Sequence, residues 1–369
     1  MTENFIHKIA LSLIPGIGSI TAKSLVAYTG SAEQVFREKE SALRQIPGVG
    51  TILAKNIINS EVMSRAGREV EFLQKNNVNA LFYLDEDYPQ RLLGCSDAPI
   101  ILYIKGNPFL NCPKVISIVG TRHATEYGRR IVDQFIAVLA ERGYKILVVS
   151  GLAYGIDIQS HKSAIRTGLP TVAVMGHGLE TVYPALHTAI AKEMIESQGG
   201  LVSDFLSNSP IERTNFLRRN RIIAGLSDAT IVVESAKKGG ALVTADIANS
   251  YNRDVFAFPG KVGDPYSEGC HFLIKSNRAV LIESVADLEN VMNWSAAKSQ
   301  SDAIQPCLFY EFNPDEKLIV DLLRSEGETA IDLICIKTTL PMNKVSPTLL
   351  NLEFAGIVKG LPGKVFKAI

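Results

Sequence analysis

The central part of the chain alternates between short apolar runs and longer amphipathic stretches. The apolar runs lie within residues 114–119, 145–149, 170–175, 230–234 and 254–258. Such a run predicts a strand that is buried on both faces, as the strands of a parallel sheet are. After the first run, residues 127–142 repeat their apolar positions at helical spacing. The alternation predicts an α/β fold with a doubly wound parallel sheet, and such sheets bind ligands at the carboxyl ends of their strands.

Glycine-containing turns with hydroxyl or cationic residues follow three of these predicted strands. Gly-Thr-Arg at residues 120–122 ends the first strand, and Ser-Gly at residues 150–151 ends the second. After the fourth strand, residues 237–244 hold two lysines, a pair of glycines that opens a helix, and a threonine one turn further on. Glycines let the backbone approach a ligand closely, amides at a helix start attract anions, and guanidinium groups match phosphate oxygens. The sequence therefore predicts a phosphate site at this edge of the sheet.

A strongly basic segment precedes the fourth predicted strand. Residues 213–221 hold four arginines and one phenylalanine, and the apolar residues 222–226 follow. The basic part therefore begins a buried helix, where like positive charges oppose the helix dipole unless an anion is bound. Arginines that track phosphates and a phenylalanine that stacks on a base suit a single-stranded nucleic acid. The alternative is a solvated helix end with one core phenylalanine.

One candidate for catalysis lies on the helix after the second predicted strand. Asp157 and His161 are four residues apart on that helix and could pair. We expect a helix-stabilising contact between them rather than a catalytic dyad. The turn before this helix lacks the spacing G-x-G-x-x-G, so the sequence does not support a dinucleotide site.

The N-terminal region contains an internal repeat. Residues 11–18 and 43–50 both end in Pro-Gly-x-Gly, with matching apolar positions around them. Each copy predicts two helices joined by a tight turn, and the amides at the start of the second helix can hold a phosphate. The copies resemble helix-hairpin-helix motifs, which grip the nucleic-acid backbone. Two interpretations stay equally open, one in which the hairpins contact DNA and one in which they serve as a scaffold or docking element.

The composition changes beyond residue 295. Residues 296–312 begin with small polar residues that are typical of a linker. Residues 313–369 predict three helices followed by a two-stranded ribbon, which is a winged-helix architecture. The third helix, near residues 344–354, carries one lysine and one glutamate. Because a helix that enters a DNA groove uses basic or polar side chains, a protein-interaction or accessory role is favoured over groove reading.

The overall composition fits an ordinary globular protein. Lysine plus arginine and aspartate plus glutamate both number 38, so the cations at the predicted ligand edge are a local excess on a neutral chain. Five cysteines without C-x-x-C spacing argue against a disulfide framework or a metal site. The sequence lacks a signal-peptide pattern and an apolar stretch of about 18 residues. We expect a soluble cytoplasmic protein.

Together, these motifs resemble the DNA-processing protein A family (DprA, also called Smf). The resemblance rests on residues 119–122, 150–157, 239–245 and 258–260, and above all on Arg-Asn-Arg-Ile-Ile-Ala-Gly at residues 219–225. It implies a helix-hairpin-helix (SAM-like) domain over residues 1–85, an extended Rossmann-like domain over 86–295, a linker over 296–312 and a winged-helix domain over 313–369. It also implies a homodimeric, non-enzymatic protein without a cofactor, which binds single-stranded DNA, protects incoming DNA during natural transformation and loads the RecA recombinase onto it.

Carried over by position, the resemblance implies a set of DNA- and phosphate-binding residues. They are Gly120, Thr121, Arg122, Ser150, Gly151, Arg213, Asn215, Phe216, Arg218, Arg219, Asn220, Arg221, Gly239, Gly240, Thr244 and Lys261. Tyr154 stands where many members carry a basic residue, which would weaken one phosphate contact or replace it with stacking. The competing interpretation is an enzyme similar to nucleoside-monophosphate phosphoribohydrolases, which share a similar phosphate pocket. Those enzymes carry a catalytic glutamate on the helix after their glycine turn, and residues 238–245 lack it.

Overall fold

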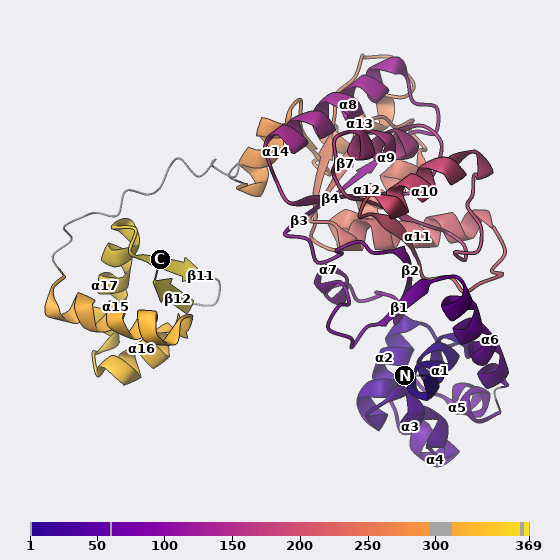
Figure 1. The fold of residues 1–369 in the computed structure, drawn as a ribbon, viewed down its shortest axis with the longest axis horizontal. Helices are drawn as coiled ribbons and strands as arrows, with labels where there is room; N and C mark the ends of the chain where they lie inside the picture. Colours follow the sequence, from indigo (N-terminus) through magenta and orange to yellow (C-terminus); the bar gives the residue numbers. More distant parts are fainter. Residues whose placement is uncertain (1, 60, 295–311, 362–364, 369) are drawn as a thin grey trace. The chain divides into compact units, whose positions relative to one another are not determined.

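The computed structural model describes residues 2–59, 61–294, 312–361 and 365–368 (Figure 1). The chain divides into two compact units, Met1–Ala297 and Lys298–Ile369, and each is described by itself. The first unit contains a large sheet with its helices and the N-terminal helices. Within the described ranges, every helix is too short or too polar to cross a membrane.

A nine-stranded sheet forms the centre of the first unit, in the order β1-β2-β6-β5-β4-β3-β7-β8-β9. Its strands are β1 (Val78–Phe82), β2 (Ile101–Gly106), β3 (Lys114–Val119), β4 (Ile146–Ser150), β5 (Thr171–Val174), β6 (Gly200–Ser203), β7 (Ala229–Val232), β8 (Asp254–Ala257) and β9 (Val280–Leu281). Strands β3 to β9 run parallel, whereas β2 is antiparallel to β6 and β1 is antiparallel to β2. The predicted doubly wound α/β sheet is confirmed.

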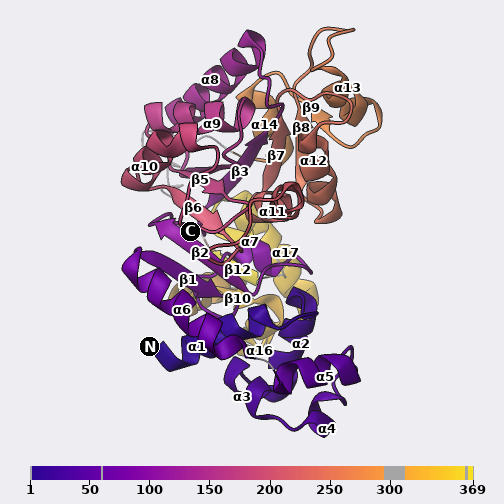
Figure 2. The ribbon, with the colours of Figure 1, turned by 90° about the vertical axis from the view of Figure 1, so that its right-hand side faces the viewer.

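Helices cover both faces of this sheet (Figure 2). One face packs against α11 (Arg213–Leu226), α12 (Gly240–Ser250) and α13 (Glu268–Lys275), and the other against α8 (Glu126–Glu141), α9 (Ile156–Arg166) and α14 (Val285–Met292). Because successive side chains of a strand point to opposite faces, Val115 and Val119 of β3 join the first cluster, and Ile116 and Ile118 join the second. Two further helices, α7 (Gln90–Leu93) and α10 (Thr188–Glu196), lie in the connections.

Six helices precede β1 in the described part of the chain, and two of them, α1 and α6, contact the β1–β2 end of the sheet (Figure 1). The six helices are α1 (Thr2–Leu13), α2 (Ser19–Thr29), α3 (Ala32–Arg37), α4 (Glu40–Leu43), α5 (Thr51–Ile58) and α6 (Val62–Lys75). The two Pro-Gly-x-Gly turns join α1 to α2 and α4 to α5, as predicted. Their first glycines, Gly16 and Gly48, have φ of 82° and 83°, a left-handed conformation that favours glycine. Residues 1–85 therefore contain both hairpins and also β1, which belongs to the sheet.

The second unit is a winged-helix domain, as predicted. It contains α15 (Pro314–Glu326), β10 (Thr329–Ala330), α16 (Ile331–Thr338), α17 (Met342–Phe354), β11 (Val358–Leu361) and β12 (Val365–Ala368), with strand order β10-β12-β11. A capping box fixes the start of α15, because the side chains of Asn313 and Glu316 each accept the other's backbone N–H at 2.9 Å. Ile319, Ile334 and Leu349 contribute one buried side chain from each helix to the core.

Candidate nucleic-acid interface

The loops that follow β3, β4 and β7 surround an open cavity of about 500 Å³, together with the first turns of α11. The order of strands reverses here, since the chain continues from β3 to β4, β5 and β6 on one side and from β7 to β8 and β9 on the other. Doubly wound sheets bind their ligands at this point. Most of the predicted site residues line this cavity, namely Gly120, Thr121, Arg122, Arg213, Phe216, Arg219, Asn220, Gly239, Gly240 and Thr244.

The loop that carries Arg122 is held by one buried acid, Glu234, which follows β7 and is 2% exposed. Its backbone carbonyl accepts the N–H of Thr121 at 2.7 Å. Its carboxylate accepts the N–H of Thr125 at 2.9 Å and the Thr125 hydroxyl at 2.5 Å. Glu234 therefore fixes the loop at both ends, and Arg122 between them lies exposed at the rim of the cavity.

The loop after β4 docks against the same segment through a glycine. Gly155 has φ of 80°, and a Cβ at this position would overlap the carbonyl oxygen of Thr121. The N–H of Ile156 donates to that oxygen at 3.1 Å. A side chain at position 155 would separate the two loops, so glycine is required here for the close approach that brings Asp157 to the cavity.

A buried pair of opposite charges forms part of the cavity wall. Arg219 is 5% exposed and Asp157 is 8% exposed. Burial raises the pKa of the Asp157 carboxyl, which the nearby Arg219 guanidinium opposes, and burial likewise lowers the pKa of Arg219. Gly151 leaves room for the pair, since a Cβ there would overlap both side chains.

The guanidinium of Arg219 also carries unused donors. Its Nε and Nη1 atoms have no hydrogen-bond partner among the described residues. Buried polar groups are nearly always satisfied, and a guanidinium matches phosphate or carboxylate oxygens in geometry and charge. The arrangement is therefore suited to an anionic ligand in the cavity.

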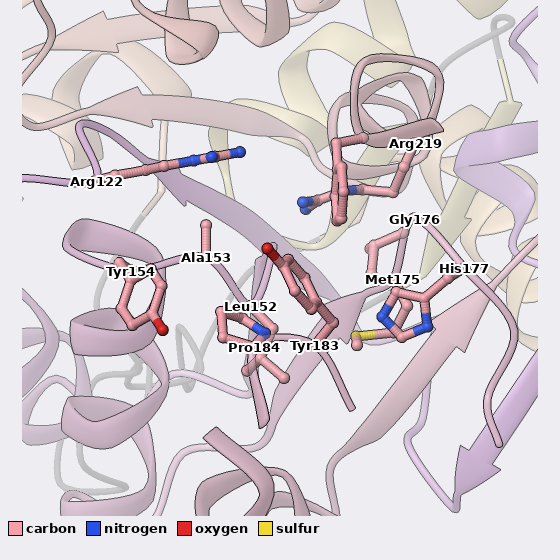
Figure 3. Close-up of a pocket in the computed structure, with 12 residues that line it drawn as sticks. Arg122, Leu152, Ala153, Tyr154, Met175, Gly176, His177, Tyr183, Pro184 and Arg219 are labelled. Atoms are coloured by element: carbon pink, nitrogen blue, oxygen red, sulfur yellow. The ribbon is translucent and has the colours of Figure 1, made fainter. Parts of the chain in front are cut away.

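A smaller recess of about 40 Å³ adjoins the cavity and shares Arg122, Ala153, Phe216 and Arg219 with it. In Figure 3 the guanidinium groups of Arg122 and Arg219 point toward one another. The remaining walls are mostly apolar or aromatic, with Leu152, Tyr154, Val174, Met175, Gly176, His177, Tyr183 and Pro184. The cavity that suits an anion is thus continuous with a recess that suits a planar, largely apolar group.

Tyr183 and His177 give this recess its specific chemistry. The rings of Tyr183 and Phe216 lie 5.8 Å apart, so Phe216 has an aromatic neighbour beside the cavity. His177 is fully buried, and its Nδ1–H donates to the carbonyl of Gly178 at 2.8 Å. Burial lowers the pKa of His177, which favours the neutral ring. Its Nε2 atom has no partner within the described ranges and, in this tautomer, can accept a hydrogen bond.

Some predicted site residues support the wall instead of lining the cavity. The hydroxyl of Ser150 donates to the carbonyl of Ile118 at 2.6 Å, and the side-chain amide of Asn215 donates to the carbonyl of Pro210 at 2.9 Å. Both side chains are buried. They hold β4 against β3 and fix the start of α11, respectively.

Three predicted cationic contacts also lie outside the cavity lining. The guanidinium of Arg218 lies 5.4 Å over the ring of Phe205. Arg221 forms an ion pair of 2.5 Å with Asp204. Lys261 is exposed in the loop that follows β8.

The expected contact between Asp157 and His161 is wrong. The Nε2–H of His161 donates to the carbonyl of Gly151 at 2.5 Å, and its Nδ1 lies 2.7 Å from the hydroxyl of Thr171. Burial lowers the pKa of His161 to about 4, so the ring is neutral and structural. The i, i+4 spacing is present, but the buried Arg219 attracts Asp157 more strongly than a neutral imidazole can.

Sequence reasoning missed Glu234 and most of the recess. Glu234 is the last residue of one predicted strand and His177 lies two residues beyond another, so the rule that places sites at strand ends could have identified both. Tyr183 and Pro184 lie in a loop without a regular pattern, and their proximity to Phe216 depends on the tertiary fold. Among the described residues, no group of three or more His, Cys, Asp or Glu side chains could hold a metal ion.

The fold and the cavity define a Rossmann-like protein with an arginine-lined site at the switch point of its sheet. Comparison with known proteins is more specific. Residues 79–293 match the family of DNA recombination-mediator protein A, and residues 303–364 match the DprA winged helix domain. The chain belongs to the DNA recombination-mediator protein A family, which confirms the resemblance seen in its motifs.

Individual relatives agree with this assignment. Protein Smf from Escherichia coli K12 is 35% identical over 321 residues, which cover 82% of this chain and 83% of that protein. The crystal structure of DNA processing protein A from Streptococcus pneumoniae matches 77% of this chain and 97% of its own, with 30% identity and a TM-score of 0.62. The Helicobacter pylori protein, solved in a study of its single-stranded DNA binding mode, matches 58% of this chain and 95% of its own, with 25% identity and a TM-score of 0.52.

Proposed function

We propose that this protein binds single-stranded DNA in the arginine-lined cavity and hands it to the RecA recombinase without catalysing a reaction. The observation that carries the proposal is that Arg122, Arg213 and Arg219 surround one cavity with Phe216 among them. Cationic groups that track the backbone, combined with an aromatic ring that stacks on a base, are typical of single-strand binding. The family and the Helicobacter pylori relative support the same ligand.

A phosphate group would occupy the larger cavity. Gly239, the N-cap of α12, makes no side-chain hydrogen bond to the helix. The first amides of α12 are therefore available to an anion, and the helix dipole favours negative charge there. Arg219 lines the same space, and Arg122 lies exposed at its rim.

The neighbouring recess would receive the base of the same nucleotide. Leu152 and Met175 offer apolar contact to its faces, while the Nε2 acceptor of His177 and the donors of Arg219 can pair with its polar edge. Every base presents neighbouring donors and acceptors, so this arrangement tolerates different sequences. A duplex keeps its bases stacked and paired, and extracting one costs a few kcal/mol. The site would therefore favour single strands.

The wider role follows from the family and not from the cavity. We infer that the protein acts in the cytoplasm, protects incoming DNA during natural transformation and loads RecA onto it. We also infer a homodimer through the Rossmann-like part of the chain. Strand β9 at the end of the sheet supports this inference, because Val280 and Leu281 are both 45% exposed and an open strand edge can pair with a second copy.

The decisive test measures the fluorescence anisotropy of a labelled poly-dT oligonucleotide, with unlabelled duplex as competitor. We expect preferential capture of the single strand and weaker capture by Phe216→Ala. A nucleoside-monophosphate hydrolysis assay is run in parallel, because the competing enzymatic interpretation predicts release of the base. Base release together with weak strand binding would overturn the proposal.

A further inference from the structure

A clamp from the N-terminal helices holds the loop that leads into the basic helix α11. Arg65 and Glu69 lie one turn apart on α6 and pair at 2.7 Å. The carboxylate of Glu69 accepts the backbone N–H of Ser207 at 2.9 Å and its hydroxyl at 2.6 Å. Arg65 donates to the carbonyl of Ser207 at 2.6 Å. We call Arg65, Glu69 and Ser207 the α6 clamp.

The α6 clamp is buried at its centre, which makes it more than a surface contact. Glu69 is 1% exposed and Ser207 is 5% exposed. The Glu69 side chain pairs with Arg65 and accepts hydrogen bonds on both oxygens, which is how a buried carboxylate is stabilised. Removing its carboxylate would leave the N–H of Ser207 and the guanidinium of Arg65 without these partners, so the loop would lose its fixed position.

The held loop continues directly into the cavity wall. Six residues after Ser207, α11 begins at Arg213, and Phe216 follows in its first turn. Further hydrogen bonds stiffen the segment, because Asn208 N–H donates to the Glu180 carboxylate at 3.0 Å and the Asn215 side chain donates to the carbonyl of Pro210. The segment that leads into α11 is therefore fixed at Ser207, at Asn208 and at Pro210.

Apolar packing connects the same two regions. One buried cluster extends from the N-terminal helices, with Ile9 and Leu25, through Tyr103 of β2 to Leu152 and Met175. Leu152 and Met175 are also walls of the recess beside Phe216. The N-terminal helices thus support the recess through their core and the start of α11 through the α6 clamp.

We propose that Glu69 is a positioning residue for single-strand binding, which acts through Ser207 on Arg213 and Phe216. The N-terminal helices then set the affinity of the cavity without touching the strand there. This favours the scaffold interpretation of the hairpins. The proposal rests on the proposed function and concerns the same cavity.

The test compares Glu69→Ala with Glu71→Ala, which removes an exposed carboxylate from the same helix. We expect the dissociation constant for a poly-dT oligonucleotide to rise about tenfold in Glu69→Ala, the equivalent of one misplaced charged contact, and to stay unchanged in Glu71→Ala. The log–log salt slope should shrink by about 0.7, as for one lost phosphate contact. A variant that is only destabilised has a smaller fraction of folded protein that can bind the oligonucleotide, but its log–log salt slope stays unchanged.

A double-mutant cycle with Arg213→Ala identifies the path of the effect. If Glu69 acts by placing Arg213, adding Glu69→Ala to Arg213→Ala produces little further loss, whereas independent effects multiply. Ser207→Ala removes only the hydroxyl, which donates to Glu69 at 2.6 Å and accepts from Arg65 at 3.4 Å, and leaves the backbone hydrogen bonds of the clamp. This variant carries the test if Glu69→Ala does not fold, with an expected loss of about threefold.

The outcomes separate this proposal from the proposed function. Weak binding of poly-dT by the unmodified protein would contradict the proposed function itself. Tight binding by the unmodified protein, with the same affinity and salt slope in a folded Glu69→Ala or Ser207→Ala variant, would overturn only the positioning role. Multiplicative losses in the cycle would also overturn it.

Discussion

The exposed side chain of Arg122 permits a test of the cavity that leaves the fold intact. Arg219 is unsuitable, because Arg219→Ala would leave the buried Asp157 without its opposite charge and cost about 3–5 kcal/mol of stability. The loop of Arg122 is instead held by backbone groups, the Thr125 hydroxyl and Glu234. Arg122→Ala should therefore change the free energy of unfolding by no more than about 0.5 kcal/mol.

The loss of affinity follows from the contact that Arg122 would make with the strand. A hydrogen bond to a charged group contributes about 1.5–3 kcal/mol, and each 1.4 kcal/mol corresponds to a factor of about ten in the dissociation constant. Arg122→Ala should thus weaken poly-dT binding about 10- to 150-fold at low salt. One phosphate contact fewer should shrink the log–log salt slope by about 0.7, and Arg122→Glu should weaken binding further by repulsion.

Fluorescence anisotropy across a salt series measures both quantities, and urea unfolding measures stability. Arg129→Ala is the matched control, because Arg129 is an exposed arginine on α8 that does not line the cavity. Unchanged affinity and slope in Arg122→Ala would refute the placement of the phosphate. A comparable loss in Arg129→Ala would show that overall charge, rather than the cavity, drives binding.

Three further predictions concern residues around the site. Arg221→Ala should lower the free energy of unfolding by about 3 kcal/mol in urea titration, because it leaves the Asp204 carboxylate without its opposite charge. The salt slope of single-strand binding should stay unchanged, and a reduced slope would mean that Arg221 does contact phosphate. Glu234→Ala should cost about 2 kcal/mol in the same titration and weaken strand binding, since the Arg122 loop loses its anchor; full affinity in the variant would contradict that role. Because burial lowers the pKa of His161 from 6.5 to about 4, the unfolded chain binds a proton that the folded chain does not between these values. The free energy of unfolding should therefore fall by about 3 kcal/mol as the pH drops from 6.5 to 4. This fall should be smaller in His161→Gln than in His123→Gln, which replaces an exposed histidine, and unfolding curves across this pH range measure it.

The elements that the sequence predicts well are those whose pattern is set by burial on both faces. β3 and β4 are nearly continuous apolar runs because helices cover each face of the sheet, and the serines they contain, Ser117 and Ser150, are small and buried. β6 is not among the predicted strands, since only two of its residues, Leu201 and Val202, are strongly apolar. Its place in the sheet depends on pairing with β2 and β5, which are distant in sequence.

The site likewise has a part that the sequence predicts and a part that it does not. The rule that ligands bind at strand ends places residues 120–122 and 239–244 at one cavity, and the structure brings them together there. The recess depends on contacts between separate loops, such as the ring of Tyr183 beside Phe216, and no local pattern encodes such a contact. The α6 clamp is likewise invisible in the sequence, because an Arg–Glu pair at i, i+4 is common on exposed helix surfaces.

The arginine cluster of α11 shows why charge in a sequence does not by itself outline a binding surface. Residues 213, 216, 217 and 220 recur at helical spacing and line the cavity, whereas 218 and 221 do not line it. Arg218 covers an aromatic ring and Arg221 pairs with Asp204, so these two cations already have partners within the protein. Arg219 lies between the two roles, buried like a structural residue but with donors that no described residue uses. Such unsatisfied donors are costly in a folded protein and are tolerated where a ligand completes them. The burial of Arg219, rather than the number of neighbouring arginines, is therefore the stronger argument for an anion at this edge of the sheet.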